Sequence, residues 1–178
     1  KALVKSNPRM MHRLLETLAT AVAEYLTRQF AAGADAIQIF DSWAGALDGA
    51  DYEEFSLRYI RAVLERLPKA APVILYAKGK SPQAAALAQT VVPCLGVDWT
   101  MPLSQVRQLA GRPICLQGNL DPEFMTGEPA AAAAATQAVL ADNAGDPGHI
   151  FNLGHGITPQ ARIETFQAVV DTVVASGV

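Results

Sequence analysis

The segment 149–156 carries the clearest chemical signal in this 178-residue chain, because a short apolar run ends in a histidine held between two glycines. The apolar run predicts a buried strand, and Gly154 and Gly156 permit a sharp turn and a close approach by another molecule. Thr158-Pro159 pairs an N-cap residue with a first-turn proline, which predicts a helix start. His155 is therefore expected at the carboxyl end of a strand, beside a helix N-terminus that favours anions, where parallel α/β folds place their chemistry.

Phe40, Ser42 and Trp43 form a second candidate group, around the end of another predicted strand. The Ser42 hydroxyl can donate one hydrogen bond and accept others, which suits a ligand carboxylate, and Phe40 offers a flat apolar wall for a ring system. The alternative is architectural: Ser42 caps a turn, and Trp43 plugs the mouth of the fold. The spacing of these residues leaves both interpretations open.

Two further motifs favour architecture over chemistry. Asp98 follows an apolar run and could act as a base or accept a hydrogen bond from a ring N–H, but support of a neighbouring loop is the simpler interpretation. In the segment 116–122, Gly118 permits a close backbone approach and Asn119 can bridge loops. Direct contact of Gln117 or Asn119 with a substrate is the alternative.

The lysines and cysteines argue against a Schiff base and against a metal centre. Lys78 follows a predicted strand, but Lys80 two residues later indicates a solvated pair. Cys94 and Cys115 lie in apolar runs without a CxxC or Cys/His spacing, which predicts two reduced core thiols. Because no HxH or HExxH spacing occurs either, we expect no metal centre.

Composition excludes several classes of protein. The net charge is −3 and 17% of the residues are charged, which argues against a nucleic-acid surface. No apolar run reaches the ~18–20 residues that a membrane span requires, and no signal peptide opens the sequence. These features predict a cytoplasmic protein that binds neither nucleic acid nor a membrane, with 51% hydrophobic residues to build its core.

Short apolar runs alternate with helical patterns along the chain, and the runs lack the period-two alternation of half-exposed strands. The predicted strands are 34–41, 72–78, 94–99, 112–119 and 148–153. The predicted helices are 8–32, 52–67, 82–90, 103–109, 122–143 and 159 to the C-terminus. This order, with short connections, predicts a parallel sheet with right-handed crossovers.

Polar or glycine residues follow each predicted strand, and side chains from several strands on one rim are typical of a (β/α)8 barrel. A complete barrel has eight strand–helix units and usually needs ~250 residues, whereas this chain supplies four to five units. We therefore expect one α/β domain, residues 1–178, that forms the C-terminal part of a (β/α)8 TIM barrel. The chain opens without an initiator methionine, which indicates a piece of a longer polypeptide, and the open sheet edges of such a piece predict aggregation.

Four motifs together resemble the bacterial type of the uroporphyrinogen decarboxylase family, in that family's order. They are Ile39–Gly45, Leu95–Trp99, Leu116–Pro122 and His149–Gly156. The resemblance implies a (β/α)8 barrel and a cytoplasmic homodimer that acts in haem and porphyrin biosynthesis. The implied carboxy-lyase reaction removes carbon dioxide from the four acetate side chains of uroporphyrinogen III and gives coproporphyrinogen III. It implies no metal, pyridoxal or thiamine cofactor.

Three residues can be carried over from the family. Ser42 resembles the hydroxyl position that binds the substrate, Phe40 resembles the aromatic residue of the cleft wall, and His155 resembles the histidine that contacts a substrate carboxylate. The resemblance supports binding by His155 more firmly than proton transfer. The family's Arg-Gln-Ala-Gly-Arg segment, its central aspartate and a tyrosine belong to an N-terminal half without a counterpart here. The main acid and base residues are therefore expected outside this chain, which alone should be inactive.

Two other interpretations stay open: a methyltransferase of the same superfamily, and a non-catalytic protein from another functional class. A methyltransferase would move methyl groups between corrinoid and thiol carriers and would bind zinc through His and Cys at strand ends. The run 72–79 ends without either residue, and neither Cys94 nor Cys115 ends its strand. A non-catalytic tetrapyrrole-binding protein, or a subunit that completes a partner's barrel, would bind a porphyrinogen without releasing carbon dioxide. Stoichiometric zinc in the full-length protein would favour the methyltransferase.

Overall fold

Five parallel strands form one sheet in a computed structural model that describes residues 1–146 and 148–177. Their spatial order, β1-β2-β3-β4-β5, is also their order in the sequence. The strands are β1 (Ile37–Asp41), β2 (Val73–Ala77), β3 (Cys94–Gly96), β4 (Cys115–Leu120) and β5 (His149–Leu153). Each strand overlaps its predicted range, so the predicted parallel α/β class is confirmed.

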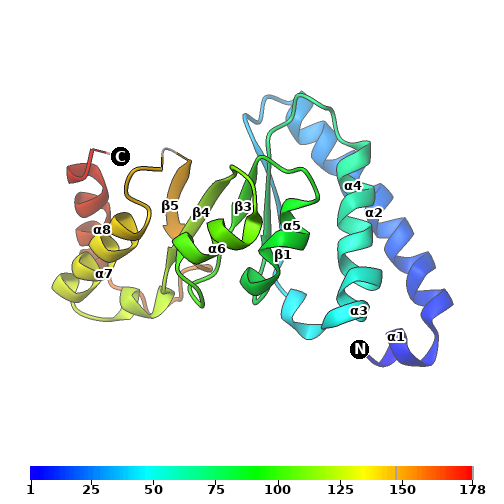
Figure 1. Ribbon diagram of the computed structural model, residues 1–178, viewed down its shortest axis with the longest axis horizontal. Helices are drawn as coiled ribbons and strands as arrows, with labels where there is room; N and C mark the ends of the chain where they lie inside the picture. The colour runs from blue at the N-terminus through cyan, green and yellow to red at the C-terminus, as the bar shows by residue number, and fades with distance from the viewer. Residues whose placement is uncertain (147, 178) are drawn as a thin grey trace.

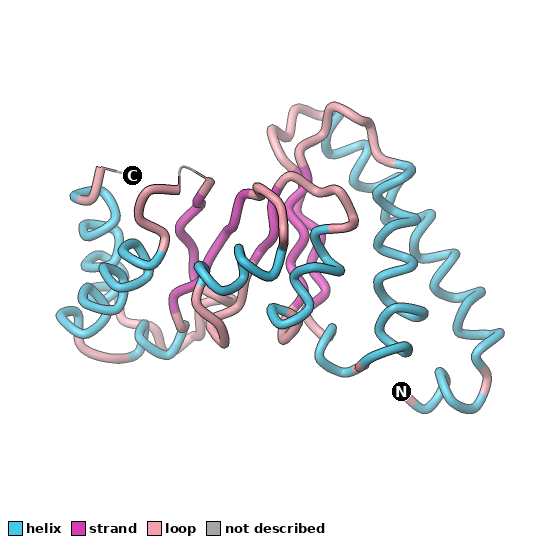
Figure 2. Tube along the Cα trace, viewed as in Figure 1, coloured by secondary structure: helices cyan, strands magenta, loops and turns pink. Residues whose placement is uncertain are grey.

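Helices connect the successive strands, and Figure 2 shows the strands as a central row between them. In Figure 1, α2 lies beside α4 at one end of the sheet and α7 lies beside α8 at the other. The α-helices are α1 (Ala2–Ser6), α2 (Pro8–Ala31), α3 (Gly49–Tyr52), α4 (Arg58–Arg66), α5 (Ala84–Ala88), α6 (Leu103–Ala110), α7 (Pro129–Asp142) and α8 (Ile163–Ala175). Shorter helical turns are η1 (Ala44–Ala46), η2 (Glu53–Leu57), η3 (Ser81–Gln83) and η4 (Pro122–Thr126). Within residues 1–146 and 148–177, no helix has the length and apolar character needed to cross a membrane.

One face of the sheet packs against the helices and holds the core. Ile39, Leu75 and Leu116 occupy registered positions on β1, β2 and β4. Leu75 and Leu116 belong to the main apolar cluster, and Ile39 packs against it. Because side chains alternate along a strand, the residues that follow them share the opposite face. On that face Phe40 is 64% exposed and Ile150 is 44% exposed. The sheet is therefore covered on one side and partly bare on the other.

Hydrogen bonds between elements three strands apart show that the bare face is concave. Gln117 on β4 donates a hydrogen bond from Nε2 to Oε1 of Gln38 on β1, at 3.2 Å. Tyr76 on β2 donates from its hydroxyl to the carbonyl oxygen of Gly154, which follows β5, at 2.8 Å. In a flat sheet, strands three positions apart are separated by about 14 Å. The sheet therefore curls toward this face, as the sheet of a (β/α)8 barrel does.

The predicted helix 122–143 is wrong as one element, because the structure divides it in two. The helical turn η4 ends at Thr126, the backbone is extended at Gly127, and α7 begins at Pro129. Proline favours the first helical turn, since it lacks the N–H that would be unpaired there. The predicted cap of the first part is confirmed, because the Asp121 side chain accepts a hydrogen bond from the Glu123 backbone N–H at 3.0 Å.

The predicted helix start at Thr158-Pro159 is also wrong. α8 begins at Ile163 instead, and residues 158–162 form a turn and extended backbone. The backbone N–H of Arg162 donates to the Met125 carbonyl oxygen at 2.8 Å, so this segment is held against η4 rather than wound into a helix. His155 therefore does not lie beside a helix N-terminus. The predicted end of this helix, at Val178, lies outside the described residues.

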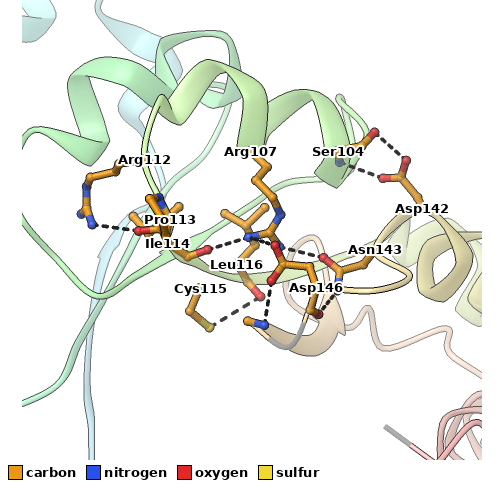
Figure 3. Close-up of polar contacts among 11 residues, drawn as sticks. Ser104, Arg107, Arg112, Pro113, Ile114, Cys115, Leu116, Asp142, Asn143 and Asp146 are labelled. Carbon is orange, nitrogen blue, oxygen red and sulfur yellow. Dashed lines mark hydrogen bonds and ion pairs between the residues drawn. The ribbon is translucent and has the colours of Figure 1, made fainter.

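Arg107 on α6 fastens the beginning of β4 to the loop between α7 and β5 (Figure 3). Its guanidinium donates to the Ile114 carbonyl oxygen at 2.7 Å and to Asn143 Oδ1 at 2.8 Å, and it lies 2.9 Å from Asp146 Oδ2. Asp146 in turn accepts from the Gly148 backbone N–H at 2.8 Å. This network places β5 in register beside β4, and β5 carries His155 at its far end.

Replacing Arg107 by methionine should therefore destabilise the protein. The variant keeps most of the side-chain volume but removes the guanidinium that pairs with the Ile114 carbonyl and the Asp146 carboxylate. We expect a loss of about 2 kcal/mol in the free energy of unfolding, since hydrogen bonds to a charged group are each worth roughly 1.5–3 kcal/mol. Urea denaturation of the full-length protein measures it, with Arg13→Met on the exposed side of α2 as the matched control. Equal midpoints for the two variants would contradict this role.

Apolar side chains are exposed at both ends of the sheet, beside the strands whose outer edges are free in the described structure. The exposed residues of α2 include Met10, Leu14, Leu18, Val22 and Tyr25, and those of α8 include Ile163, Phe166, Val170 and Val174. Because free strand edges and apolar stripes promote association, we expect the 178-residue chain on its own to self-associate. Light scattering coupled to size exclusion tests this, and reversible two-state melting of a monomer would be the contrary result.

Candidate functional site

A row of rings lies across the concave face at the carboxyl ends of the strands. Phe40 on β1 and Tyr76 on β2 are registered neighbours, with ring centroids 5.8 Å apart in an edge-on arrangement. The Tyr76 and His155 rings are nearly parallel, at 10° and 6.0 Å between centroids, and the Trp99 ring lies 6.4 Å from His155. Residues from four separate strand ends therefore meet at one mouth, as in the active sites of barrel enzymes.

Two glycines make room for this arrangement. A Cβ atom at Gly154 would lie 2.6 Å from the backbone nitrogen of Trp99, so only glycine allows the end of β5 to approach the end of β3 this closely. A Cβ atom at Gly96 would lie 2.9 Å from the Tyr76 Cβ. The prediction that Gly154 admits another molecule is wrong, because its open side is filled by this chain's own backbone. A Cβ atom at Gly156, by contrast, would point into space that is open for at least 4 Å.

Ser42 lies at the same end of the sheet as His155, in the turn that follows β1. It is half-buried, two residues beyond Phe40. The preceding residue, Asp41, accepts a hydrogen bond from the Ser56 hydroxyl, which anchors this strand end to the helical segment behind it. Trp43 does not plug the mouth, since it is 84% exposed. The structure therefore brings the predicted residues Phe40, Ser42 and His155 together at the carboxyl ends of the strands.

Asp98 supports loops, as the simpler interpretation of its motif predicted. It is 1% exposed and accepts hydrogen bonds from the backbone N–H groups of Gly79 at 2.5 Å and Thr100 at 3.0 Å. The Thr100 hydroxyl also donates to it. Because the carboxylate is occupied by these donors, it holds the loops after β2 and β3 in place and is not free to act on a ligand.

The motif around Gly118 is architectural too. A Cβ atom at Gly118 would lie 2.5 Å from the Val97 carbonyl oxygen, which confirms the predicted close approach of the backbone. The Asn119 side chain donates to the carbonyl oxygens of Asp98 at 2.9 Å and Met101 at 2.7 Å. Its two amide hydrogens are thus used within the protein, and the predicted bridge between loops is confirmed.

The two lysines after β2 differ, and the predicted solvated pair is wrong. Lys80 is 1% exposed, with Nζ donating to the Leu47 carbonyl oxygen at 2.5 Å and lying 3.2 Å from Asp48 Oδ1. It ties the loop that follows Ser42 to the loop after β2. Lys78 is half-buried, and its Nζ lies 5.5 Å above the Trp99 ring. Lys78 therefore adds a positive charge to the mouth.

Cys94 and Cys115 are free thiols that face each other across β3 and β4 at registered positions. Burial, and then the neighbouring Cys115, raise the pKa of the Cys94 thiol above its usual range, so it stays protonated as predicted for a core thiol. Across residues 1–146 and 148–177, no three His, Cys, Asp or Glu side chains form a group able to hold a metal ion.

Tyr76 and Trp99 are the members of the mouth that the sequence did not single out. Tyr76 carries a polar tip in an otherwise apolar run, which signals a hydroxyl with a specific partner. Burial, and then the nearby Asp98, raise its pKa to about 12, so it keeps its hydrogen. Its approach to His155 depends on the curvature of the sheet, which the sequence pattern does not give.

The chain is similar in sequence to proteins of one family. The family described as Uroporphyrinogen decarboxylase (URO-D) matches residues 1–175. The Uroporphyrinogen decarboxylase of Tolumonas auensis is 41% identical over 174 residues, which cover 93% of this chain and 49% of that protein. The protein of the same name from Neisseria meningitidis serogroup C is 42% identical and is covered to 50%, against 97% of this chain. The chain thus spans about half the length of the curated relatives that it matches.

A solved structure supports the fold assignment. A methyltransferase from Methanosarcina mazei superposes with a TM-score of 0.85 over 99% of this chain and 52% of its own, at 18% sequence identity. At that identity the likeness concerns the fold alone. It agrees with the curled parallel sheet, and the predicted architecture, part of a (β/α)8 barrel, is confirmed.

Proposed function

The chain belongs to the uroporphyrinogen decarboxylase (URO-D) family, and from that premise we propose that it forms half of a uroporphyrinogen decarboxylase. The proposed reaction converts the four acetate side chains of uroporphyrinogen III to methyl groups and releases four molecules of carbon dioxide. We further propose that residues 1–178 lie in one barrel domain, that the full-length enzyme is a cytoplasmic homodimer, and that it works without a cofactor.

The chemistry of this reaction defines what the protein must supply. A proton added to the pyrrole carbon next to the acetate makes the ring an electron acceptor, so the carbon–carboxylate bond can break and release carbon dioxide. The methylene carbon then takes a proton as the ring proton leaves, and each acetate consumes one proton overall. The enzyme must therefore hold a large ring, bind several carboxylates and deliver protons at the ring.

The mouth described above suits the binding part of this task. Phe40 is an exposed apolar ring against which a pyrrole can lie. Ser42 and His155 carry groups that can donate to carboxylates, and Lys78 supplies a positive charge above the Trp99 ring. One observation carries the proposal. Phe40 on β1 and His155 after β5 lie at the carboxyl ends of the strands, and both rings contact the ring of Tyr76.

We do not assign the proton-transfer part of the task to Asp98 or Tyr76 in this mouth. Asp98 is enclosed by its own loop donors, and the Tyr76 hydroxyl is directed at the Gly154 carbonyl. We therefore assign Phe40, Ser42 and His155 to substrate binding and place the main acid and base residues in the half of the barrel that lies outside these 178 residues.

The loss of carboxylates from the substrate tests the proposed function. The full-length protein is incubated without oxygen with uroporphyrinogen III, and the products are separated after oxidation to porphyrins. We expect coproporphyrin, after intermediates with seven, six and five carboxylates. Tight binding of the substrate without any loss of carboxylates would contradict the decarboxylase and favour a tetrapyrrole-binding protein.

A further inference from the structure

His155 has one hydrogen-bond partner on its ring within the described part of the chain. The Tyr76 hydroxyl oxygen lies 3.3 Å from His155 Nδ1, and the same hydroxyl lies 2.8 Å from the Gly154 carbonyl oxygen. Both contacts join Tyr76 on β2 to the short segment that follows β5. The Nε2 atom of His155 has no hydrogen-bond partner among residues 1–146 and 148–177, and the ring is half-buried.

The hydrogens in this contact can be assigned by counting donors. A carbonyl oxygen only accepts, so the 2.8 Å contact with Gly154 requires the hydroxyl hydrogen of Tyr76. That hydroxyl has one hydrogen, and its oxygen is therefore left with lone pairs toward His155. The hydroxyl oxygen can accept a hydrogen bond from Nδ1 only if Nδ1 carries a hydrogen. Because burial keeps Tyr76 protonated, this assignment holds across the neutral range.

We propose that Tyr76 is a positioning residue that fixes His155 with its hydrogen on Nδ1, so that Nε2 is the atom presented to the ligand. This inference rests on the proposed function, in which His155 binds a substrate carboxylate. With Nδ1 already occupied, the second proton of the ring can enter only at Nε2. The positive charge then forms with an N–H directed away from Tyr76, and a carboxylate of the substrate is bound by that N–H.

The nearly parallel rings support this role. The Tyr76 and His155 rings lie at 10° to each other, and the Trp99 ring lies at 28° to His155, so two aromatic neighbours restrict rotation of the imidazole. Gly96 opposite Tyr76 leaves the space that the phenol ring needs. The tyrosine therefore controls both the orientation of the imidazole and the nitrogen that carries its hydrogen.

Nitrogen NMR of the full-length protein with labelled histidine tests the proposal without any substrate. The His155 signals are identified by their loss in His155→Asn. We expect the neutral wild-type ring to carry its hydrogen on Nδ1, and Tyr76→Phe to shift the ring toward the form with the hydrogen on Nε2. A wild-type ring with its hydrogen on Nε2, or a spectrum unchanged by Tyr76→Phe, would overturn the inference. If Tyr76→Phe does not fold, the wild-type spectrum alone decides.

The chain offers a matched control. Tyr59 on α4 also contacts a histidine through its hydroxyl, at 2.7 Å from His12 Nδ1, but it does so on the helical side of the molecule. Tyr59→Phe removes the same kind of contact and should leave the His155 signals and the KM unchanged. This control separates an effect of the mouth from a general effect of losing a tyrosine hydroxyl.

Kinetics add a second readout. Tyr76→Phe should raise KM for uroporphyrinogen III about 3- to 10-fold with little change in kcat, as expected for one lost neutral hydrogen bond. In the His155→Asn background the same change should add less than about twofold, because the two residues act as one unit. Full additivity of the two substitutions would contradict the proposal. If His155→Asn leaves KM unchanged, the binding role of His155 fails, whereas the NMR result still decides which nitrogen Tyr76 sets.

Discussion

Replacing His155 by asparagine should raise KM for uroporphyrinogen III about 10- to 100-fold while kcat falls much less. A hydrogen bond from a charged imidazole to a carboxylate is worth roughly 1.5–3 kcal/mol, and each 1.4 kcal/mol corresponds to a factor of about ten in affinity. The carboxylate is bound alike before and during the reaction, so the loss falls on KM rather than on kcat. Steady-state rates of the full-length enzyme under anaerobic conditions measure both constants.

Ser42→Ala is the companion variant, with a smaller effect of about 3- to 10-fold on KM, because it removes one neutral hydroxyl. Both variants should melt within a few degrees of the wild type, since neither side chain belongs to the buried core. An unchanged KM in both would remove these residues from the binding site. A fall in kcat alone for His155→Asn would point instead to proton transfer by the imidazole.

Asp98→Ala should cost about 4 kcal/mol in the free energy of unfolding, the largest loss of stability that we expect from one polar side chain here. The substitution removes the carboxylate that accepts from the backbone N–H groups of Gly79 and Thr100, and hydrogen bonds to a charged group are each worth roughly 1.5–3 kcal/mol. The midpoint of urea denaturation of the full-length protein measures the effect. Asp35→Ala, at an exposed position just before β1, is the matched control and should stay within about 0.5 kcal/mol.

Activity gives an independent check on Asp98. Because its carboxylate holds the loops that carry Lys78 and Trp99, the alanine variant should also bind substrate more weakly at temperatures where it is folded. A variant that keeps the stability of the wild type but loses turnover would contradict the architectural role and identify Asp98 as a group that acts on the substrate.

The parallel sheet could be predicted from the sequence because its signal is local. The strands are short apolar runs, and the helices between them start at recognisable residues such as Asp121. The same local rules failed at Thr158-Pro159, where a hydrogen bond from Arg162 to Met125 holds the chain away from a helix. That contact joins residues far apart in the sequence, which no capping pattern reports.

The candidate site could be predicted only in part, for a similar reason. Phe40, Ser42 and His155 lie at strand ends, a position that periodicity and family motifs reveal. Tyr76 lies in the site because the sheet curls. Lys80 is buried because the loop after β1 packs over it. Both depend on the way that distant strands and loops pack, so neither residue could be assigned before the structure.

The structure of the full-length protein with bound coproporphyrinogen III tests the central claim most directly. We predict that the product lies at the carboxyl ends of the strands, with one carboxylate hydrogen-bonded to His155 Nε2, another near Ser42 and a pyrrole ring against Phe40. A ligand bound at the amino ends of the strands, or one in contact with neither His155 nor Ser42, would contradict it.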